Sequence, residues 1–460
     1  MLPEAVLRDL EVNSSRRVQD LVNLLSIPSV STSPEHAADV QRAARWLAER
    51  LEAMGFEVEF LETERHPVVL AQRVFHAQRP TLLIYGHYDV QPADPYDEWI
   101  SPPFVPRIWG DYVYARGASD DKGQLLTHLH AMEAVLRTQG ELPLNVKVLL
   151  EGEEEIGSPS LPQVLSQRAR ELEAQAVVIS DGSQLAPGIP AITYGLRGLA
   201  HAQIDVIGPR LDLHSGSFGG LVTNPIQALC QILCSLRSPD GTVAIPGFYQ
   251  DVKPLESWER EEILRLPFEE ESLKEYLGVE FLTGESGYSP LERRWARPTL
   301  DVNGIWGGFS GHGSKTVIPS RAGAKVSMRL VPQQDPVAIN HLLRKFVMEI
   351  SPPGVKVEIT DFKGAQPVLV DRNLPQIKAA ARAVEAGFGK APVFIREGGS
   401  IPVVNMLKEL LGIEAILLLG WGSPEDGAHS PNERFSLGSF HAGTRASAAL
   451  LFELASMAEH

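Results

Sequence analysis

Short apolar runs alternate with helix-type segments along much of this chain, and this alternation constrains the fold more than any other feature. The runs FEVEFLET, VVLAQRV, PTLLIYGHYDV, LNVKVLL and AVVISDG have the length and residue types of β-strands. Helical spacing of apolar residues is clearest over residues 37–54, 123–140 and 160–174. Strands that alternate with helices predict an α/β fold built on one sheet.

The alternation is interrupted in the middle of the chain. From about Gly198 the strands LAHAQIDVIGP, VIPSRAGAKVSMRLVP and GVKVEITDF accompany the helices NPIQALCQILCSL and AINHLLRKFVMEI, while residues 238–300 have no regular pattern. The α/β pattern returns after about residue 376, and 460 residues favour more than one domain. We therefore expect one domain split into residues 1–197 and 376–460, with an α+β domain inserted at 198–375.

Composition excludes several classes of partner. The net charge of -16 argues against nucleic acid and anionic membrane surfaces, because both need basic patches. No run of about eighteen apolar residues occurs, so no membrane span is expected. The first 22 residues read as an amphipathic, charged helix without an apolar signal core, which favours the cytoplasm. Cys230 and Cys234 are the only cysteines and do not make a disulfide framework.

Polar residues cluster at the ends of the expected elements. The segments are GHYDVQP (86–92), ARGASDDKG (115–123), EGEEEIGS (151–158), SDG (180–182) and GAHSPNE (427–433). Each alone is weak, because a single His is usually hydrogen-bonded for structural reasons and Asp beside Gly often forms a turn. Adjacent carboxylates repel, however, unless something positive lies between them.

Together, the clusters are typical of a metal site. In α/β sheets, ligands gather beyond the carboxyl ends of the strands, where these segments are expected. Two histidines and three carboxylates suit zinc or a similar divalent ion, but are too many for one tetrahedral site. Two ions about 3.5–4 Å apart, bridged by a carboxylate, would use all five.

In this order the five segments resemble the M20 family of metallopeptidases, in the group of carboxypeptidase G2, acetylornithine deacetylase and carnosinase. The resemblance covers almost the whole chain. The stretches DLHSGSFGG, KTVIPSRAGAKVSMRLVP and REGGSIPV are similar to the dipeptidase branch that contains cytosolic nonspecific dipeptidase. This implies a zinc-peptidase-like catalytic domain with a central mixed sheet. An inserted lid or dimerisation domain, and hence a homodimer, are implied as well.

The resemblance also implies the metal ligands. His87 and Asp181 would hold one ion, Glu155 and His429 would hold the other, and Asp120 would bridge the two. The peptide bond after Asp120 would be cis. The ions would be zinc, with manganese or cobalt as alternatives.

The same resemblance assigns the catalytic groups. Glu154 would be the general base, taking a proton from the attacking water and returning it to the leaving amine. Asp89 would hydrogen-bond His87 and fix its tautomer. Neighbouring side chains on an extended backbone diverge, so Glu154 and Glu155 can have separate roles. Glu153 is expected outside the metal shell.

Substrate-binding residues are implied mainly in the inserted domain. His214 resembles a family histidine that reaches into the partner subunit's active site and stabilises the oxyanion; its alternative role is to cap a loop. Arg329 would bind the substrate carboxylate, or else form a salt bridge on a strand. Thr316, Glu397 and Ser400 would line the dipeptide pocket, or else be polar groups of loops and turns.

The function expected is metal-dependent hydrolysis of the amide bond of dipeptides or similar small substrates. One alternative is an N-acyl amino acid deacylase, such as a succinyl-diaminopimelate desuccinylase. A second is a catalytically silent binding protein with the M20 fold.

The stretch GFSGHGSKT only half resembles a phosphate-binding loop, because Ser314 rather than Gly precedes Lys315. We therefore do not expect a phosphate-binding loop there.

Overall fold

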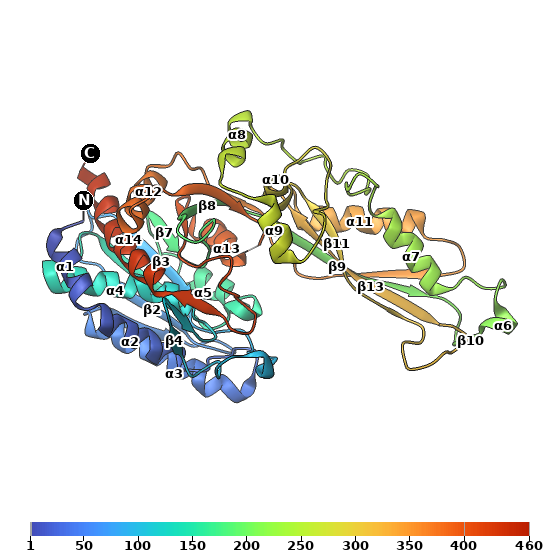
Figure 1. The fold of residues 1–460 in the computed structure, drawn as a ribbon, viewed down its shortest axis with the longest axis horizontal. Coiled ribbons are helices and arrows are strands. Elements are labelled where there is room, and N and C mark those ends of the chain that lie inside the picture. Colours follow the sequence, from blue (N-terminus) through green and yellow to red (C-terminus); the bar gives the residue numbers. More distant parts are fainter. Residues whose placement is uncertain (1, 400, 460) are drawn as a thin grey trace. The chain divides into compact units, whose positions relative to one another are not determined.

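The structure is a computed structural model that describes residues 2–399 and 401–459. It separates into two compact units (Figure 1). The first unit comprises Met1–Tyr194, Val370–Ile395 and Pro402–His460, and the second comprises Gly195–Leu369 and Arg396–Ile401. The first unit is therefore assembled from discontinuous segments. The lid or dimerisation role expected for the middle of the chain stays a prediction.

A mixed sheet forms the centre of the first unit. Its strands are β1 (Glu57–Leu61), β2 (Val68–Arg73), β6 (Asn145–Glu151), β3 (Thr81–His87), β7 (Ala176–Ile179), β17 (Ile416–Gly420) and β8 (Ala191–Leu196), in that spatial order. The neighbours β6, β3, β7 and β17 run parallel, whereas β1, β2 and β8 pair antiparallel. Strands β15 (Val368–Leu369) and β16 (Val393–Glu397) also pair with β8. The predicted α/β class with a central mixed sheet is confirmed.

Helices cover this sheet, and the central strands β6, β7 and β17 are buried along their whole length. Helix α3 (Ala37–Ala53) packs against β1 and β2. Helix α4 (Lys122–Gln139) packs against β3 and α14 (Leu437–Ala455), which also contacts α12 (Pro375–Phe388). Further α-helices of this unit are α1 (Glu4–Val12), α2 (Ser14–Leu25), α5 (Leu161–Gln167) and α13 (Pro402–Leu411).

Strand direction decides where the functional segments lie. Because β3, β6, β7 and β17 are parallel, the segments that follow them leave from the same edge of the sheet. A small sheet adds a further connection, since β18 (Arg434–Ser436) pairs with β5 (Tyr112–Tyr114), which pairs with β4 (Arg107–Trp109). This pairing places residues 115–123 beside residues 427–433, which end where β18 begins.

The second unit contains a four-stranded antiparallel sheet. Its order is β11 (Thr299–Gly307), β13 (Arg321–Leu330), β9 (Gly198–Ile207) and β14 (Lys356–Asp361). Buried and half-buried residues alternate along β9, and α7 (Pro225–Ser235) and α11 (Pro336–Ile350) pack on the sheet. Shorter elements are β10 (Leu213–His214), α6 (Ser215–Phe218), α8 (Ser257–Arg265), α9 (Glu270–Leu277), α10 (Pro290–Trp295) and β12 (Val317–Ile318).

Three expectations about local structure were wrong. Residues 238–300 are not irregular, because they contain α8, α9 and α10; the Ser289–Glu292 capping box that starts α10 is readable in the sequence. The helix expected at 160–174 ends at Gln167, where the chain turns to bury Leu172. The amphipathic helix expected over the first 22 residues is broken at Asn13 into α1 and α2.

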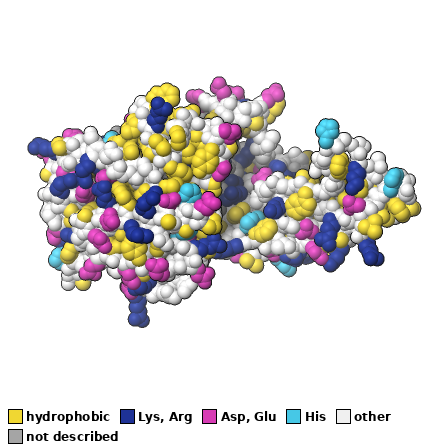
Figure 2. Space-filling model, turned by 90° about the horizontal axis from the view of Figure 1, so that it is seen from below, with side chains coloured by type: hydrophobic (Ala, Val, Ile, Leu, Met, Phe, Trp, Pro, Cys, Tyr) yellow, Lys and Arg dark blue, Asp and Glu magenta, His cyan; other side chains and the backbone are white. Residues whose placement is uncertain are grey.

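Charged side chains of both signs are spread over the face of the first unit that Figure 2 presents. Lys and Arg side chains of the first unit are interspersed there with Asp and Glu side chains. Within the described residues, none of the helices is both long enough and apolar enough to span a membrane.

Candidate metal centre

The five candidate ligands all belong to the first unit and come from the ends of its elements. His87 is the last residue of β3, and Asp181 follows β7. Glu155 lies in the 3-10 turn η3 (Glu154–Ile156) after β6, and His429 lies in the loop after β17. Asp120 stands just before α4. The parallel order of the strands therefore brings together residues far apart in sequence.

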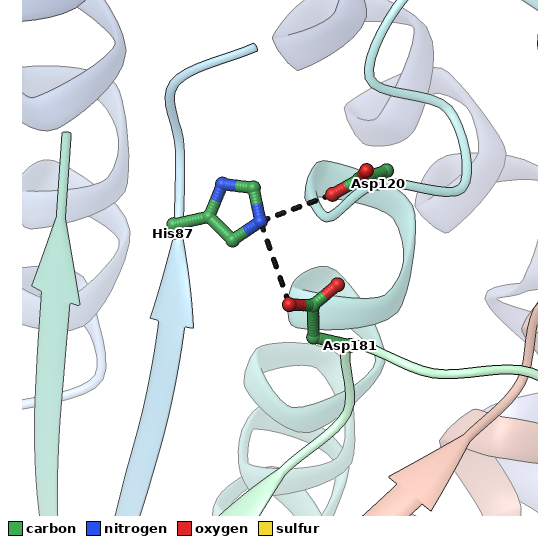
Figure 3. Close-up of side chains that lie close together, drawn as sticks. All are labelled: His87, Asp120 and Asp181. Atoms are coloured by element: carbon green, nitrogen blue, oxygen red, sulfur yellow. Dashed lines mark hydrogen bonds and ion pairs between the residues drawn. The ribbon is translucent and has the colours of Figure 1, made fainter. Parts of the chain in front are cut away.

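His87, Asp120 and Asp181 form the first group. Their ligand atoms lie within 4.8 Å of one another. As Figure 3 shows, the His87 ring points toward both carboxylates, with Nε2 at 3.1 Å from Asp120 Oδ1 and 3.9 Å from Asp181 Oδ2. The His87 side chain is completely buried.

Asp120, Glu155 and His429 form the second group, with the same limit of 4.8 Å between ligand atoms. His429 Nε2 lies 2.9 Å from Asp120 Oδ2 and 3.3 Å from Glu155 Oε2. The two oxygens of Asp120 thus face different histidines, as a bridging carboxylate requires. The peptide bond between Asp120 and Asp121 is cis, as the resemblance implied.

Crowded carboxylates dominate the electrostatics of these groups. Burial, with the neighbouring Glu155 and Asp120 carboxylates, raises the pKa of Glu154 to about 7 against the opposing effect of His87. Burial and then Asp120 also raise the pKa of Asp181 well above its ordinary value. Hydrogen bonds to Asp120 and Glu155 raise the pKa of His429 to about 10. The arrangement therefore favours added positive charge.

These residues fit a pair of divalent cations. Each group offers one imidazole nitrogen and two carboxylate oxygens, a donor set that suits zinc and similar metals. A cation in each group would stabilise the ionised carboxylates, whereas burial, and then the neighbouring carboxylates, now raise the pKa values of Asp181 and Glu154. Metal binding would require the histidines to lose their protons, because metals bind the unprotonated ring nitrogen.

Asp89 connects the first histidine to the acidic segment. Its carboxylate is fully buried, and Oδ1 lies 3.3 Å from His87 Nδ1. The same carboxylate accepts hydrogen bonds from the backbone N–H groups of Glu154 at 3.2 Å and Glu155 at 3.1 Å. One side chain therefore orients the His87 ring and the start of η3.

The backbone of the acidic segment differs from the extended form expected. Glu154 and Glu155 lie in the 3-10 turn η3, which ends at Gly157 with φ at +83°. Their side chains diverge because successive residues of such a turn rotate about its axis, not because of a strand's alternation. Gly152 precedes the turn, and a Cβ there would lie 2.7 Å from the Tyr88 ring. Only glycine permits this close approach.

The other two acids of the segment face the interior. Glu151 accepts hydrogen bonds from the hydroxyls of Tyr85 and Ser158. Glu153 accepts from Thr63 Oγ1, His66 N–H and Ser160, and 1% of it is exposed. Among the described residues, Glu153 belongs to neither ligand group, in line with the expected register.

The expected substrate-binding residues that the structure describes lie in the second unit. His214 caps α6, with Nδ1 accepting from Gly216 N–H at 3.0 Å, the alternative role considered for it. The Thr316 carbonyl accepts from Ser215 N–H, and Arg329 is a half-buried residue of β13. Burial raises the pKa of Glu397, although Arg294 opposes the shift. Ser400 lies outside the described residues, and all five roles stay predictions.

Three residues near the site were not assigned from the sequence. Gln91 Nε2 donates to Glu155 Oε2 at 2.8 Å, and Arg116 forms a buried ion pair with Glu433 at 2.8 Å. All three lie inside the polar segments identified in the sequence, and this position is the only sign in the sequence that they are near the site. Their partners are 64 and 317 residues away in sequence, so only the folded chain shows the contacts.

Comparison with known proteins agrees with this geometry. Residues 83–453 match the model of "Peptidase family M20/M25/M40". The chain is 34% identical to the Cys-Gly metallodipeptidase DUG1 of Candida albicans, covering 93% of this chain and 92% of the relative. It is 31% identical to the human Beta-Ala-His dipeptidase, covering 99% and 93%.

A solved structure shares the fold as well. The M20 family metallo-carboxypeptidase Sso-CP2 from Sulfolobus solfataricus superposes with a TM-score of 0.86, at 36% identity over 96% of this chain and 99% of that one. The family match covers most of the chain, and the relatives match nearly all of it. The chain therefore belongs to peptidase family M20/M25/M40.

Proposed function

We propose that this chain is a di-metal dipeptidase that hydrolyses the peptide bond of dipeptides and similar small peptides. The observation that carries the proposal is the sharing of Asp120 between two groups of metal-binding side chains. The names of the two curated relatives support dipeptides as the substrate class.

Each residue of the centre has a part in the proposed reaction. His87 and Asp181 would hold one ion, Glu155 and His429 would hold the second, and Asp120 would contribute to both sites. When bound, two divalent ions lower the pKa of a water and polarise the carbonyl of the substrate. Zinc suits this donor set, with manganese or cobalt as alternatives.

Glu154 carries the proton in this proposal. Its carboxylate accepts a proton from the water that attacks the carbonyl carbon, and returns it to the nitrogen of the leaving amine. Asp89 keeps Glu154 in place through the Glu154 N–H, while also holding the His87 ring. Asp89 therefore acts by orienting these groups.

Substrate recognition is proposed for the second unit. His214 would stabilise the oxyanion in the partner subunit, and Arg329 would bind the substrate carboxylate bidentately. Thr316, Glu397 and Ser400 would contact the rest of the dipeptide. Burial lowers the pKa of Arg329, although Asp301 opposes the shift. The guanidinium is therefore poorly solvated, which favours its pairing with a bound carboxylate.

Removal and return of metal test the function directly. Treatment with a chelator should abolish hydrolysis, and Zn²⁺, Mn²⁺ or Co²⁺ added alone should restore it.

The substrate class is tested by assaying the reconstituted chain against dipeptides, tripeptides and N-acyl amino acids. Preference for dipeptides supports the proposal. Preference for longer peptides would favour a carboxypeptidase such as the relative Sso-CP2, and preference for N-acyl amino acids would favour a deacylase.

A homodimer formed through the second unit is part of the proposal. Strand β11 is an edge strand of its sheet. Its side chains Val302, Ile305 and Trp306 are 46%, 57% and 41% exposed. An edge strand with exposed apolar residues is suited to pairing with another chain. We expect Ile305→Glu to shift the mass in solution from two chains to one, measured by sedimentation equilibrium.

The matched control for this shift is Val12→Glu, which changes an apolar residue of the first unit that is 76% exposed. That variant should sediment as the unchanged chain does. A wild-type chain that sediments as a monomer at micromolar concentration contradicts the dimer. The cytoplasmic location expected from the sequence stays a prediction.

A further inference from the structure

We propose that Glu433, paired with Arg116, is a positioning residue that fixes Asp120 within the metal centre. The inference rests on the proposed function, because it concerns how the shared ligand of that centre is held. Neither residue belongs to the two ligand groups. Both act through the loop that precedes α4.

The Glu433 carboxylate is completely buried and organises this loop. Oε2 accepts from Arg116 Nη1 and from Gly117 N–H, each at 2.8 Å. Oε1 accepts from Ser119 N–H at 2.8 Å and from Asp120 N–H at 3.1 Å. A carboxylate has about four acceptor positions, so these donors occupy all of them. The loop from 116 to 120 is therefore shaped around one side chain.

Arg116 extends the connection to a third segment. Its side chain is 1% exposed, and Nη2 donates to the Pro92 carbonyl at 3.1 Å. Pro92 ends the segment that carries His87 and Asp89. Two buried charges of this kind need each other, because removal of one leaves the other desolvated and unpaired.

The ion pair thus joins three segments that supply candidate ligands. Glu433 follows His429 by four residues, while Asp120 N–H is one of its donors. The two oxygens of Asp120 face His87 and His429 at 3.1 Å and 2.9 Å. A shift of the loop would move both oxygens at once. The pair is therefore placed to set the geometry of both metal positions.

Glu433→Gln tests this role in the full chain. Glutamine keeps the shape but replaces one acceptor oxygen with an NH₂ group, which would face N–H donors of the loop. We expect the affinity for Zn²⁺, measured by competition with a chromophoric chelator, to fall about 10- to 100-fold. The visible absorption spectrum of the Co²⁺-loaded chain should change as well, because it reports the geometry of the ligands.

The matched control is Asp20→Asn. Asp20 is 5% exposed and accepts from both terminal nitrogens of Arg50, at 2.9 Å and 2.5 Å, so it also pairs a buried carboxylate with an arginine. It lies on α2, away from the five polar segments in sequence. This variant should lose stability but keep the wild-type Zn²⁺ affinity and Co²⁺ spectrum.

Two results from these variants would overturn the inference. One is a Glu433→Gln chain with wild-type Zn²⁺ affinity and Co²⁺ spectrum, and the other is an equal loss of affinity in Asp20→Asn. If Glu433→Gln does not fold, judged by circular dichroism of the metal-free chain, Arg116→Lys takes its place. Lysine keeps the charge but lacks the fork that reaches Glu433 and Pro92 together. Unchanged affinity there also overturns the inference, whereas a wild-type chain that binds no Zn²⁺ refutes the proposed function instead.

Discussion

Replacing Glu154 with glutamine is expected to lower kcat by about 10²- to 10⁴-fold while two metal ions remain bound. Glutamine has nearly the same shape but cannot accept the proton of the attacking water. Glu154 is outside both ligand groups, so its loss should leave metal binding intact. Metal content by mass spectrometry and steady-state rates on a dipeptide measure the two effects separately.

Glu153→Gln is the matched control for this prediction. Glu153 is the adjacent acid, but it contacts Thr63, His66 and Ser160 instead of the ligand groups. We expect it to cost stability while the rate per folded chain stays close to that of wild type. Loss of hydrolysis in Glu153→Gln with activity retained in Glu154→Gln would show that the assigned register is wrong by one residue.

Asp120→Ala is expected to remove both ions together. Substituting a residue that only hydrogen-bonds to a metal ligand weakens metal affinity about 10- to 100-fold. Removing a ligand shared by both ions should therefore weaken metal affinity by more than this. Hydrolysis should fall to background because both metal positions lose a ligand. Metal content after dialysis against a fixed concentration of free Zn²⁺ measures the loss.

Single-group variants sharpen the comparison. Asp181→Ala removes a residue of the first group only, and His429→Ala a residue of the second only. Each should weaken one ion and retain the other, with a metal content near one per chain. If Asp120→Ala still holds two ions, or if His429→Ala alone loses both, Asp120 is not the shared ligand.

Much of the fold was predictable because local signals and burial agreed. The apolar runs that became β3, β6, β7 and β17 are buried along nearly all of their length, and such runs stand out in a sequence. The segment of β8 was missed although it is equally buried, because it lies among Pro and Gly residues without a clear helix beside it. Strand β4 is exposed and only three residues long, so its run RIW is too short to stand out in a sequence.

For the site, residue types were predictable but their supports were not. The motif order pointed to His87, Asp120 and the other ligands, and the structure brings their side chains together. The turn η3 was not expected from the sequence. It depends on hydrogen bonds from the N–H groups of Glu154 and Glu155, which follow β6, to Asp89, which follows β3. The contacts of Glu433 likewise join residues more than 300 positions apart. Such long-range hydrogen bonds leave no periodic trace in a sequence.

The position of β17 in the central sheet has a consequence for synthesis of the protein. This strand lies between β7 and β8, yet it is made more than 200 residues after both. On the ribosome, β7 and β8 therefore have unpaired edges until residues 416–420 emerge, while the strands of the second unit are already complete. His429 emerges later still. The edges of β7 and β8 can pair with other chains until residues 416–420 fill the gap, and the group of Asp120, Glu155 and His429 is incomplete until residue 429 has been made.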